Sequence, residues 1–101
     1  MILETAQIDV VPGKEAEFEA GVRAALPLFR RAKGCRGLDL QRSVEKPSTY
    51  QLMVTWDTLE NHTVDYRNSP DFQEWRRLVG GCFAGAPQVL HTAVVGEPVA
   101  F

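Results

Sequence analysis

The stretch that decides the fold is residues 56–77, which reads WDTLENHTVDYRNSPDFQEWRR. A strand ends at Trp56, and the polar residues that follow begin a short helix, with Asp57 as its predicted cap and Glu60 as the partner in a capping box. The chain breaks at Ser69-Pro70 and restarts as a second helix, because serine favours the N-cap position and proline fits the first helical turn. This segment therefore predicts a strand followed by a helix in two pieces.

Upstream of this stretch, hydrophobic periodicity predicts a strand and then a helix. Apolar residues alternate along residues 2–11, as in a half-buried strand, and Pro12-Gly13 ends this strand. Residues 14–32 carry apolar side chains three and four positions apart, which is typical of an amphipathic helix. We expect a kink at Pro27, which removes one helical hydrogen bond, and an end at Gly34.

Three further strands complete the chain. Residues 35–44 and 49–56 alternate in hydrophobicity and predict a hairpin, and residues 88–95 form the last strand. The order is β-α-β-β-α-β, which predicts an α+β fold of the ferredoxin-like class, with a four-stranded antiparallel sheet covered by helices on one face. At 101 residues, the chain has the length of one domain, residues 1–101.

The sheet face that points away from the helices is more apolar than a wet surface usually is. Its predicted residues are Gln7, Gln41, Gln51, Met53, Thr55, Leu90, Thr92 and Val94. A second copy packed sheet to sheet, as a two-fold homodimer, would cover this face. The alternative is a monomer with a few exposed apolar residues, which is common.

Composition argues against several classes of function. The net charge of −2 provides no basic surface for nucleic acid. No apolar run has the length of a bilayer span, and the first residues do not combine a basic region with an apolar core as a secretory leader does, so we expect a cytoplasmic protein that does not bind membranes. Cys35 and Cys82 lie far apart and are expected to be reduced, partly buried thiols.

With these elements the chain resembles the antibiotic biosynthesis monooxygenase family, whose members form dimeric α+β barrels. The resemblance covers nearly the whole chain and is carried by the element order, Trp56-Asp57, Glu60 and Ser69-Pro70-x-Phe72. It implies a pocket between the helices and the inner sheet face. It also implies oxidation of polycyclic phenols or quinols by molecular oxygen without metal or flavin, although other members degrade haem, act as isomerases or have no assigned activity.

The chain departs from the family pattern in two places. Many members carry a histidine three residues before the Ser-Pro break, where this chain has Tyr66, and its own histidine lies one turn earlier at His62. The haem-degrading branch uses an asparagine, a tryptophan and a histidine at places nearest to Ala6, Asp65 and Trp75 here. The iron ligand is thus missing, and haem degradation is not expected.

The candidate catalytic residues are His62, Tyr66 and Trp56. Leu59, His62 and Tyr66 lie three or four positions apart on one helix face, and because Leu59 must face the core, the other two are drawn inward. His91 alternates with apolar neighbours and is placed on the inner face of the last strand. Two imidazoles, a phenol and an indole would then line one apolar cavity. The alternative is that both histidines are structural.

The candidate substrate-binding residues are His91, Trp75, Arg76 and Phe72. Phe72 and Trp75 share a helical stripe that is equally typical of a core. Arg76 lies beside this stripe and would meet an anionic oxygen, or else it belongs to a solvated face. Two histidines with no inward carboxylate do not make a metal site, so neither a metal nor another cofactor is predicted.

These side chains suggest oxidation of a small aromatic or quinone-like ligand. A phenol would stack near Trp56 and lose its proton to His62, and the phenolate would pass an electron to oxygen, forming a hydroperoxide that collapses to a quinone. Tyr66 or Arg76 would hold the developing oxyanion. The alternatives are a non-catalytic small-molecule-binding domain and an oxygen-independent isomerase or cyclase that uses His62 and Tyr66 as an acid–base pair.

Overall fold

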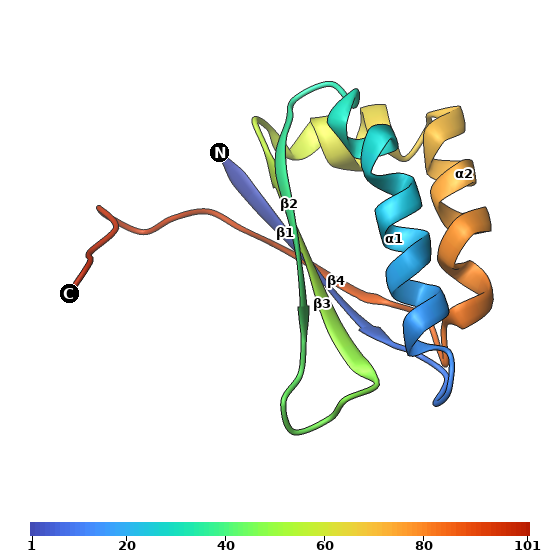
Figure 1. Ribbon diagram of the computed structural model, residues 1–101. Helices are drawn as coiled ribbons and strands as arrows, with labels where there is room; N and C mark the ends of the chain where they lie inside the picture. The colour runs from blue at the N-terminus through green and yellow to red at the C-terminus, as the bar shows by residue number, and fades with distance from the viewer.

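The structure is a computed structural model that describes residues 1–101 and has two layers, an antiparallel sheet and the helices that cover one of its faces (Figure 1). In chain order the elements are β1 (Ile2–Asp9), α1 (Glu15–Arg30), β2 (Cys35–Arg42), β3 (Thr49–Trp56), the π-helical segment η1 (Asn61–Tyr66), α2 (Pro70–Val79), the short 3-10 turn η2 (Gly80–Cys82) and β4 (Gln88–Thr92). The strands lie in the order β2-β3-β1-β4. The predicted β-α-β-β-α-β order and ferredoxin-like α+β class are confirmed.

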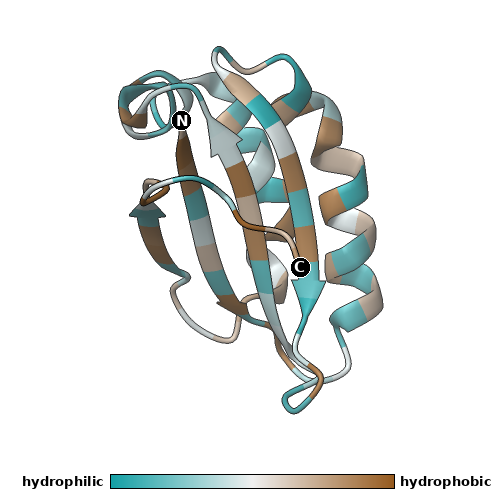
Figure 2. Cartoon of the chain, turned by 90° about the vertical axis from the view of Figure 1, so that its left-hand side faces the viewer, coloured by the Kyte–Doolittle hydropathy of each residue, from teal (hydrophilic) through white to brown (hydrophobic).

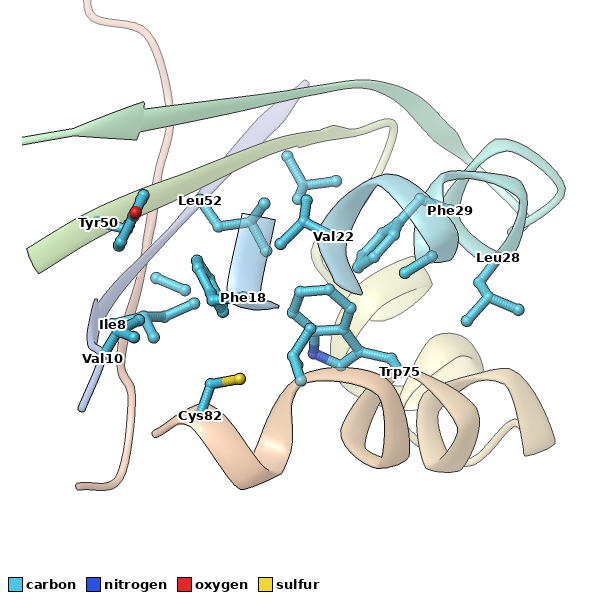
Figure 3. Packing of buried hydrophobic residues seen from close by; sticks show 14 of the residues in the cluster. Ile8, Val10, Phe18, Val22, Leu28, Phe29, Tyr50, Leu52, Trp75 and Cys82 are labelled. Atoms are coloured by element: carbon cyan, nitrogen blue, oxygen red, sulfur yellow. The ribbon is translucent and has the colours of Figure 1, made fainter. Parts of the chain in front are cut away.

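The core lies between the sheet and the two α-helices (Figure 3). Alternate residues of β1 and β3 point into it, and Ala6 and Ile8 are paired with Leu52 and Tyr50 across these strands. Phe18 of α1 is fully buried and packs on the ring of Tyr50 at 4.8 Å. Burying one such aromatic side chain contributes roughly 1.5–3 kcal/mol, so this layer is the main source of stability.

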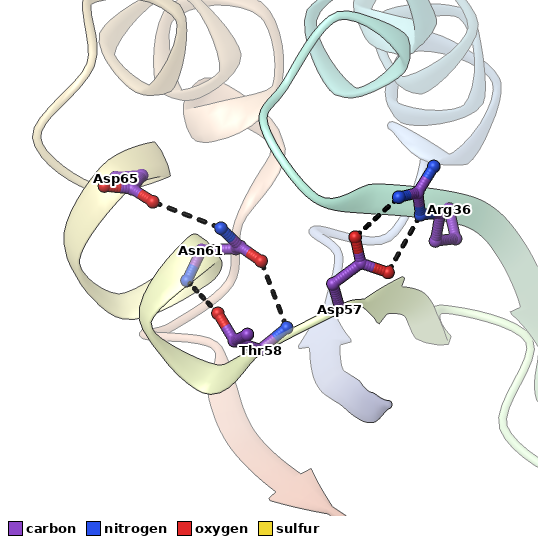
Figure 4. A network of polar contacts seen from close by, with 5 residues as sticks. All are labelled: Arg36, Asp57, Thr58, Asn61 and Asp65. Atoms are coloured by element: carbon purple, nitrogen blue, oxygen red, sulfur yellow. Dashed lines mark hydrogen bonds and ion pairs between the residues drawn. The ribbon is translucent and has the colours of Figure 1, made fainter.

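The helix that follows β3 is capped one residue later than the sequence predicts (Figure 4). The Thr58 N–H donates to Asn61 Oδ1 at 3.0 Å, and the Asn61 N–H donates to Thr58 Oγ1 at 3.2 Å. The prediction of a capping box between Asp57 and Glu60 is therefore wrong. The physical reason is that Asp57 is occupied by Arg36, whose Nε and Nη2 donate to its carboxylate at 2.8 and 2.6 Å.

The second piece of the broken helix begins as predicted, whereas the first has an unexpected geometry. Pro70 is the first residue of α2, and Ser69 Oγ accepts the Phe72 N–H at 3.3 Å. The first piece, Asn61–Tyr66, is a π-helix rather than an α-helix. No helix of the chain combines the length and the apolar character needed to cross a membrane.

The predicted end of the first helix is also corrected. The helix α1 ends at Arg30, and Gly34 lies four residues later in the turn that leads into β2, with φ of 77°. The Gly34 carbonyl accepts the Asp57 N–H at 2.8 Å. A Cβ atom added at Gly34 would lie 2.0 Å from Asn61 Oδ1. This turn is thus fitted closely against the start of the broken helix.

The last strand is shorter than predicted. The strand β4 ends at Thr92, which pairs with Leu3, because β1 begins at Ile2 and offers the chain beyond Thr92 almost nothing to pair with. Val94 is therefore not on the outer sheet face, and Val95 is not on the inner one. Both belong to the exposed residues 93–101, which leave the body on the side of the sheet opposite the helices (Figure 1).

Hydrophilic and hydrophobic residues alternate along the strands (Figure 2), and the residues on the outer face are of both kinds. Four glutamines, Gln41, Gln51, Gln7 and Gln88, are paired neighbours across β2, β3, β1 and β4. In the next row, Thr5 lies between Met53 and Leu90. Leu90 is 68% exposed, so part of this surface is apolar and uncovered within one chain.

Candidate functional site

A cavity of about 390 Å³ lies between the sheet and the two pieces of the broken helix. Ten of its sixteen lining residues are hydrophobic, and these ten come from β1, β3, β4, α1, η1, α2 and the chain that connects α2 to β4. Its ionisable or hydroxyl-bearing lining residues are Glu4, His62, Tyr66, Arg67 and Arg76. An apolar enclosure of this size with a few polar groups is the usual form of a small-molecule site.

Glu4 of β1 lines this cavity and is 5% exposed. Its Oε1 accepts the Trp56 Nε1–H at 3.0 Å and lies 3.4 Å from His62 Nε2. Its Oε2 accepts no hydrogen bond from within the chain, which leaves this oxygen free for a ligand. Glu4 was not among the residues singled out from the sequence, although its alternation with Ala6 and Ile8 already places it on the inner face.

Burial moves the pKa values of this pair in opposite directions. Burial raises the pKa of Glu4 from 4.5 to about 6, opposed by the Trp56 hydrogen bond and the charge of Arg67. Burial also lowers the pKa of His62 from 6.5 to about 4, helped by the charges of Arg67 and His91. The 3.4 Å contact between Glu4 and His62 would favour an ion pair, but burial deprives both the carboxylate and the imidazolium of hydration, and this effect is the larger one. At neutral pH the pair is an ionised carboxylate beside a neutral imidazole.

His62 connects the cavity to His91. Its Nδ1 lies 2.7 Å from His91 Nε2, so a neutral His62 that donates from Nε2 towards Glu4 accepts the His91 Nε2–H at Nδ1. His91 is half-buried and does not line the cavity, in contrast to the predicted position. Burial lowers its pKa. Glu4, His62 and His91 thus form a row that runs from the cavity to the edge strand β4 of the sheet.

Trp56 lies behind His62 rather than on the cavity wall. Its side chain is fully buried, and the indole stacks on the His62 ring with centroids 5.3 Å apart and an interplanar angle of 19°. The prediction that Trp56 and His91 line the cavity with His62 and Tyr66 is therefore wrong. The indole instead holds both the His62 ring, by stacking, and the Glu4 carboxylate, by a hydrogen bond.

Tyr66 lines the cavity and has a hydroxyl group with no partner. This group is buried and forms no hydrogen bond within the chain. Burial raises the pKa of Tyr66, so the phenol stays protonated and remains a donor. An unpaired buried hydroxyl costs roughly 1–3 kcal/mol, which a ligand oxygen would recover by accepting its hydrogen bond.

The predicted substrate-binding residues of α2 do reach the cavity. Trp75 and Phe72 line it while also packing on other aromatic rings, at 5.1 Å from Phe29 and 5.8 Å from Tyr66 respectively. Arg76 lines it too, with its guanidinium 5.9 Å from the centre of the Phe72 ring. The two interpretations of Phe72 and Trp75, as core and as cavity wall, therefore both apply.

The π-helical segment brings His62 and Arg67 to the same cavity. The Arg67 N–H donates to the His62 carbonyl at 3.2 Å, a hydrogen bond that spans five residues. Single π turns of this kind are frequent at functional sites. Arg67 was not singled out from the sequence, because an α-helical register does not align it with His62. No three His, Cys, Asp or Glu side chains are arranged so as to hold a metal ion.

The opposed pKa shifts predict how stability depends on pH. The shifted pKa of Glu4 contributes fully to the stability of the fold below pH 4.5, and this contribution is lost as the pH rises through about 6. The shifted pKa of His62 contributes above pH 6.5, and its contribution is lost as the pH falls through about 4. Their effects oppose each other between these values. The Glu4→Gln variant should therefore lose about 1.5 kcal/mol more unfolding free energy than the parent on acidification from pH 6.5 to 4.5.

Urea titrations of both proteins across this range measure that difference. The His62→Gln variant is the converse case, because only the Glu4 contribution remains. The unfolding free energy of this variant should therefore rise on acidification relative to that of the parent. Parallel pH profiles for the parent and both variants would contradict the assigned protonation states.

Comparison with known proteins supports the family resemblance. The sequence model of the antibiotic biosynthesis monooxygenase family matches residues 1–78. The uncharacterized protein YczJ of Bacillus subtilis is 36% identical over 91 residues, which cover 90% of this chain and 96% of YczJ. A crystal structure of a candidate antibiotic biosynthesis monooxygenase from Bordetella bronchiseptica is 60% identical, with a TM-score of 0.92 over 93% of this chain and 96% of that one.

A more distant structure, Rv0793 from Mycobacterium tuberculosis, has a TM-score of 0.79 at 21% identity and covers 97% of this chain and 98% of its own, which shows a shared fold. The family match spans most of the chain, including both pieces of the broken helix up to residue 78. The chain therefore belongs to the antibiotic biosynthesis monooxygenase family.

Proposed function

We propose that the protein is a cofactor-independent monooxygenase that oxidises a phenolic or quinol-type small molecule with molecular oxygen. The observation that carries this proposal is the buried Glu4–His62 pair, which opens on an apolar cavity beside the unpaired hydroxyl of Tyr66. A base, a hydrogen-bond donor and a mainly apolar cavity are what the oxidation of a phenol by oxygen needs from a protein. Membership of the family supports the same reaction class.

In this mechanism the phenol gives its hydroxyl proton to Glu4, with His62 holding the carboxylate in place. The electron-rich phenolate transfers one electron to oxygen, and the resulting radical pair combines at the ring carbon para to the oxygen. The hydroperoxide formed there loses its ring proton and expels hydroxide, which leaves as water. One oxygen atom ends in the quinone and the other in water. Tyr66 donates to the phenolic oxygen while it carries negative charge.

Oxygen dependence tests the proposal most directly. Phenols of two fused rings, such as 1-naphthol and 5-hydroxy-1-naphthoate, should give quinone products in air and none under nitrogen. The His62→Ala variant should be slower by about 100-fold, because the Glu4 carboxylate that takes the proton loses the side chain that positions it. Liquid chromatography of the products and an oxygen electrode measure both quantities. The exposed Asn68→Ala substitution in the same segment is the control and should leave the rate unchanged.

Other outcomes identify the alternatives. A product that forms equally well under nitrogen would indicate an isomerase or cyclase in which Glu4, His62 and Tyr66 move protons only. A ligand that raises the melting temperature without oxygen uptake or product would indicate a binding domain. In either case the monooxygenase proposal fails.

We also propose that two copies pack through their sheets as a homodimer. Leu90 is 68% exposed on the outer face, and the apolar residues Val94, Val95, Val99 and Phe101 of the uncovered chain end leave the body on the same side. Light scattering should give twice the chain mass of 11.3 kDa. The Leu90→Glu variant should give a monomer, whereas Val64→Glu, 49% exposed in η1, should remain a dimer. A monomeric parent would contradict this assembly.

A further inference from the structure

The cavity carries more positive than negative charge, although the chain as a whole has a net charge of −2. Its charged lining residues are Arg67, Arg76 and the single carboxylate Glu4, while His62 is neutral at pH 7 because its pKa is lowered to about 4. Two guanidinium groups against one carboxylate leave one positive charge in the lining. An occupant with one negative charge would balance it.

Arg67 and Arg76 differ from most other arginines of the chain in having no acidic partner. Four arginines form ion pairs: Arg31 with Asp71, Arg36 with Asp57, Arg42 with Glu19 and Arg77 with Glu74. Arg23 and Arg30 are also unpaired and, like Arg67 and Arg76, exposed, but they lie on α1 and do not line this cavity. The two cavity arginines thus have hydrogen-bond donors that no carboxylate of the protein uses.

The surroundings of these two arginines favour a flat, aromatic ligand. The Arg76 guanidinium lies over the Phe72 ring, and Phe72, Trp75 and Phe83 all line the same cavity. The charge of Arg67 reaches inward to Glu4 and His62, whose pKa values it lowers. A guanidinium group binds a carboxylate through two parallel hydrogen bonds, a geometry that fits a ligand carboxylate better than a point charge.

We propose that the ligand of this cavity is a phenol that carries one carboxylate, which Arg67 and Arg76 bind while the phenolic hydroxyl faces Glu4 and Tyr66. This inference rests on the proposed function and names its substrate class. The volume of about 390 Å³ suits a compound of two fused rings. The carboxylate fixes which end of the compound meets the Glu4–His62 pair, so it decides orientation as well as affinity.

The test uses two ligands that differ only in the carboxylate. Binding of 1-naphthol and of 5-hydroxy-1-naphthoate is measured by titration calorimetry under nitrogen, which prevents turnover. The carboxylate should tighten binding by about tenfold or more, since hydrogen bonds to charged groups are worth this much. The Arg67→Gln and Arg76→Gln variants should each lose most of this preference without loss of affinity for 1-naphthol. Arg23→Gln, on the exposed face of α1, should keep it.

The results separate this inference from the oxygenase proposal. Equal affinities for the two ligands in the parent, or a carboxylate preference that survives in both variants, would overturn the anion site. If the preference holds and depends on the arginines but neither ligand is oxidised in air, the anion site stands and the oxygenase proposal fails. If only 1-naphthol is bound and oxidised, the oxygenase proposal stands and the anion site is wrong.

Discussion

Turnover of a phenolic substrate should fall by at least about 100-fold in the Glu4→Gln variant, while the chain stays folded. The amide keeps the volume of the side chain, and its oxygen still accepts the Trp56 Nε1–H that Glu4 Oε1 accepts at 3.0 Å. What is lost is the negative charge and the free Oε2 that takes the proton. Steady-state oxygen uptake and circular dichroism measure activity and folding in the same preparation.

The pH dependence makes this result specific to Glu4. In the parent, kcat/KM should rise with a midpoint near pH 6, where the buried carboxylate ionises, and this step should be absent from the residual activity of Glu4→Gln. Glu60→Gln, an exposed change on the same side of the molecule as η1, is the control and should keep both rate and profile. Undiminished activity of Glu4→Gln would assign the base to His62 alone.

A loss of about 3 kcal/mol of unfolding free energy is expected for Gly34→Ala. Gly34 has φ of 77°, where an alanine is strained, and the added Cβ would lie 2.0 Å from Asn61 Oδ1. Relief would require Asn61 to move, which would break its two hydrogen bonds with Thr58 at the start of the broken helix. This is a large share of the 5–15 kcal/mol that stabilises a typical domain. Urea denaturation measures it.

Two further variants distinguish the backbone strain at Gly34 from the steric clash of its added Cβ with Asn61. Gly37→Ala, three residues away, adds a Cβ with no atom within 4 Å and has no positive φ, so it should change stability by less than about 1 kcal/mol. In an Asn61→Ala background, Gly34→Ala should cost clearly less than in the parent, because the amide group that the Cβ meets is gone. Equal costs in both backgrounds would show that only the backbone conformation matters.

The fold was predictable because its signals are local and repeat along the chain. Alternation in β1 and β3 and the three-to-four spacing in α1 each place one apolar face, and the Ser69-Pro70 break is a helix start that the structure confirms. The errors come from contacts between distant segments. Asp57 fits a capping pattern on its own, but Arg36 of β2 takes its carboxylate. The length of β4 depends on where β1 begins.

The site was predictable only in part for the same reason. His62 and Tyr66 line the cavity as predicted, although Leu59, which was expected to face the core with them, is 39% exposed. Glu4 was passed over because a carboxylate among inward residues is rare, and its partners Trp56 and His62 are more than fifty residues away in the chain. Trp56 was placed correctly on the inner face. Whether an inward side chain lines the cavity or lies behind another ring depends on how deep it is buried, and periodicity does not encode this depth.

The hydrogen bond between His62 and His91 has a consequence for how the buried acid communicates with bulk water. A bound ligand would plug the cavity and cut Glu4 off from solvent on that side. The His62 and His91 imidazoles connect Glu4 to solvent on another side, since His91 is half-buried on the edge strand β4. The two imidazoles therefore offer a second route for proton exchange between the Glu4 carboxylate and the surrounding water, one that does not pass through the cavity.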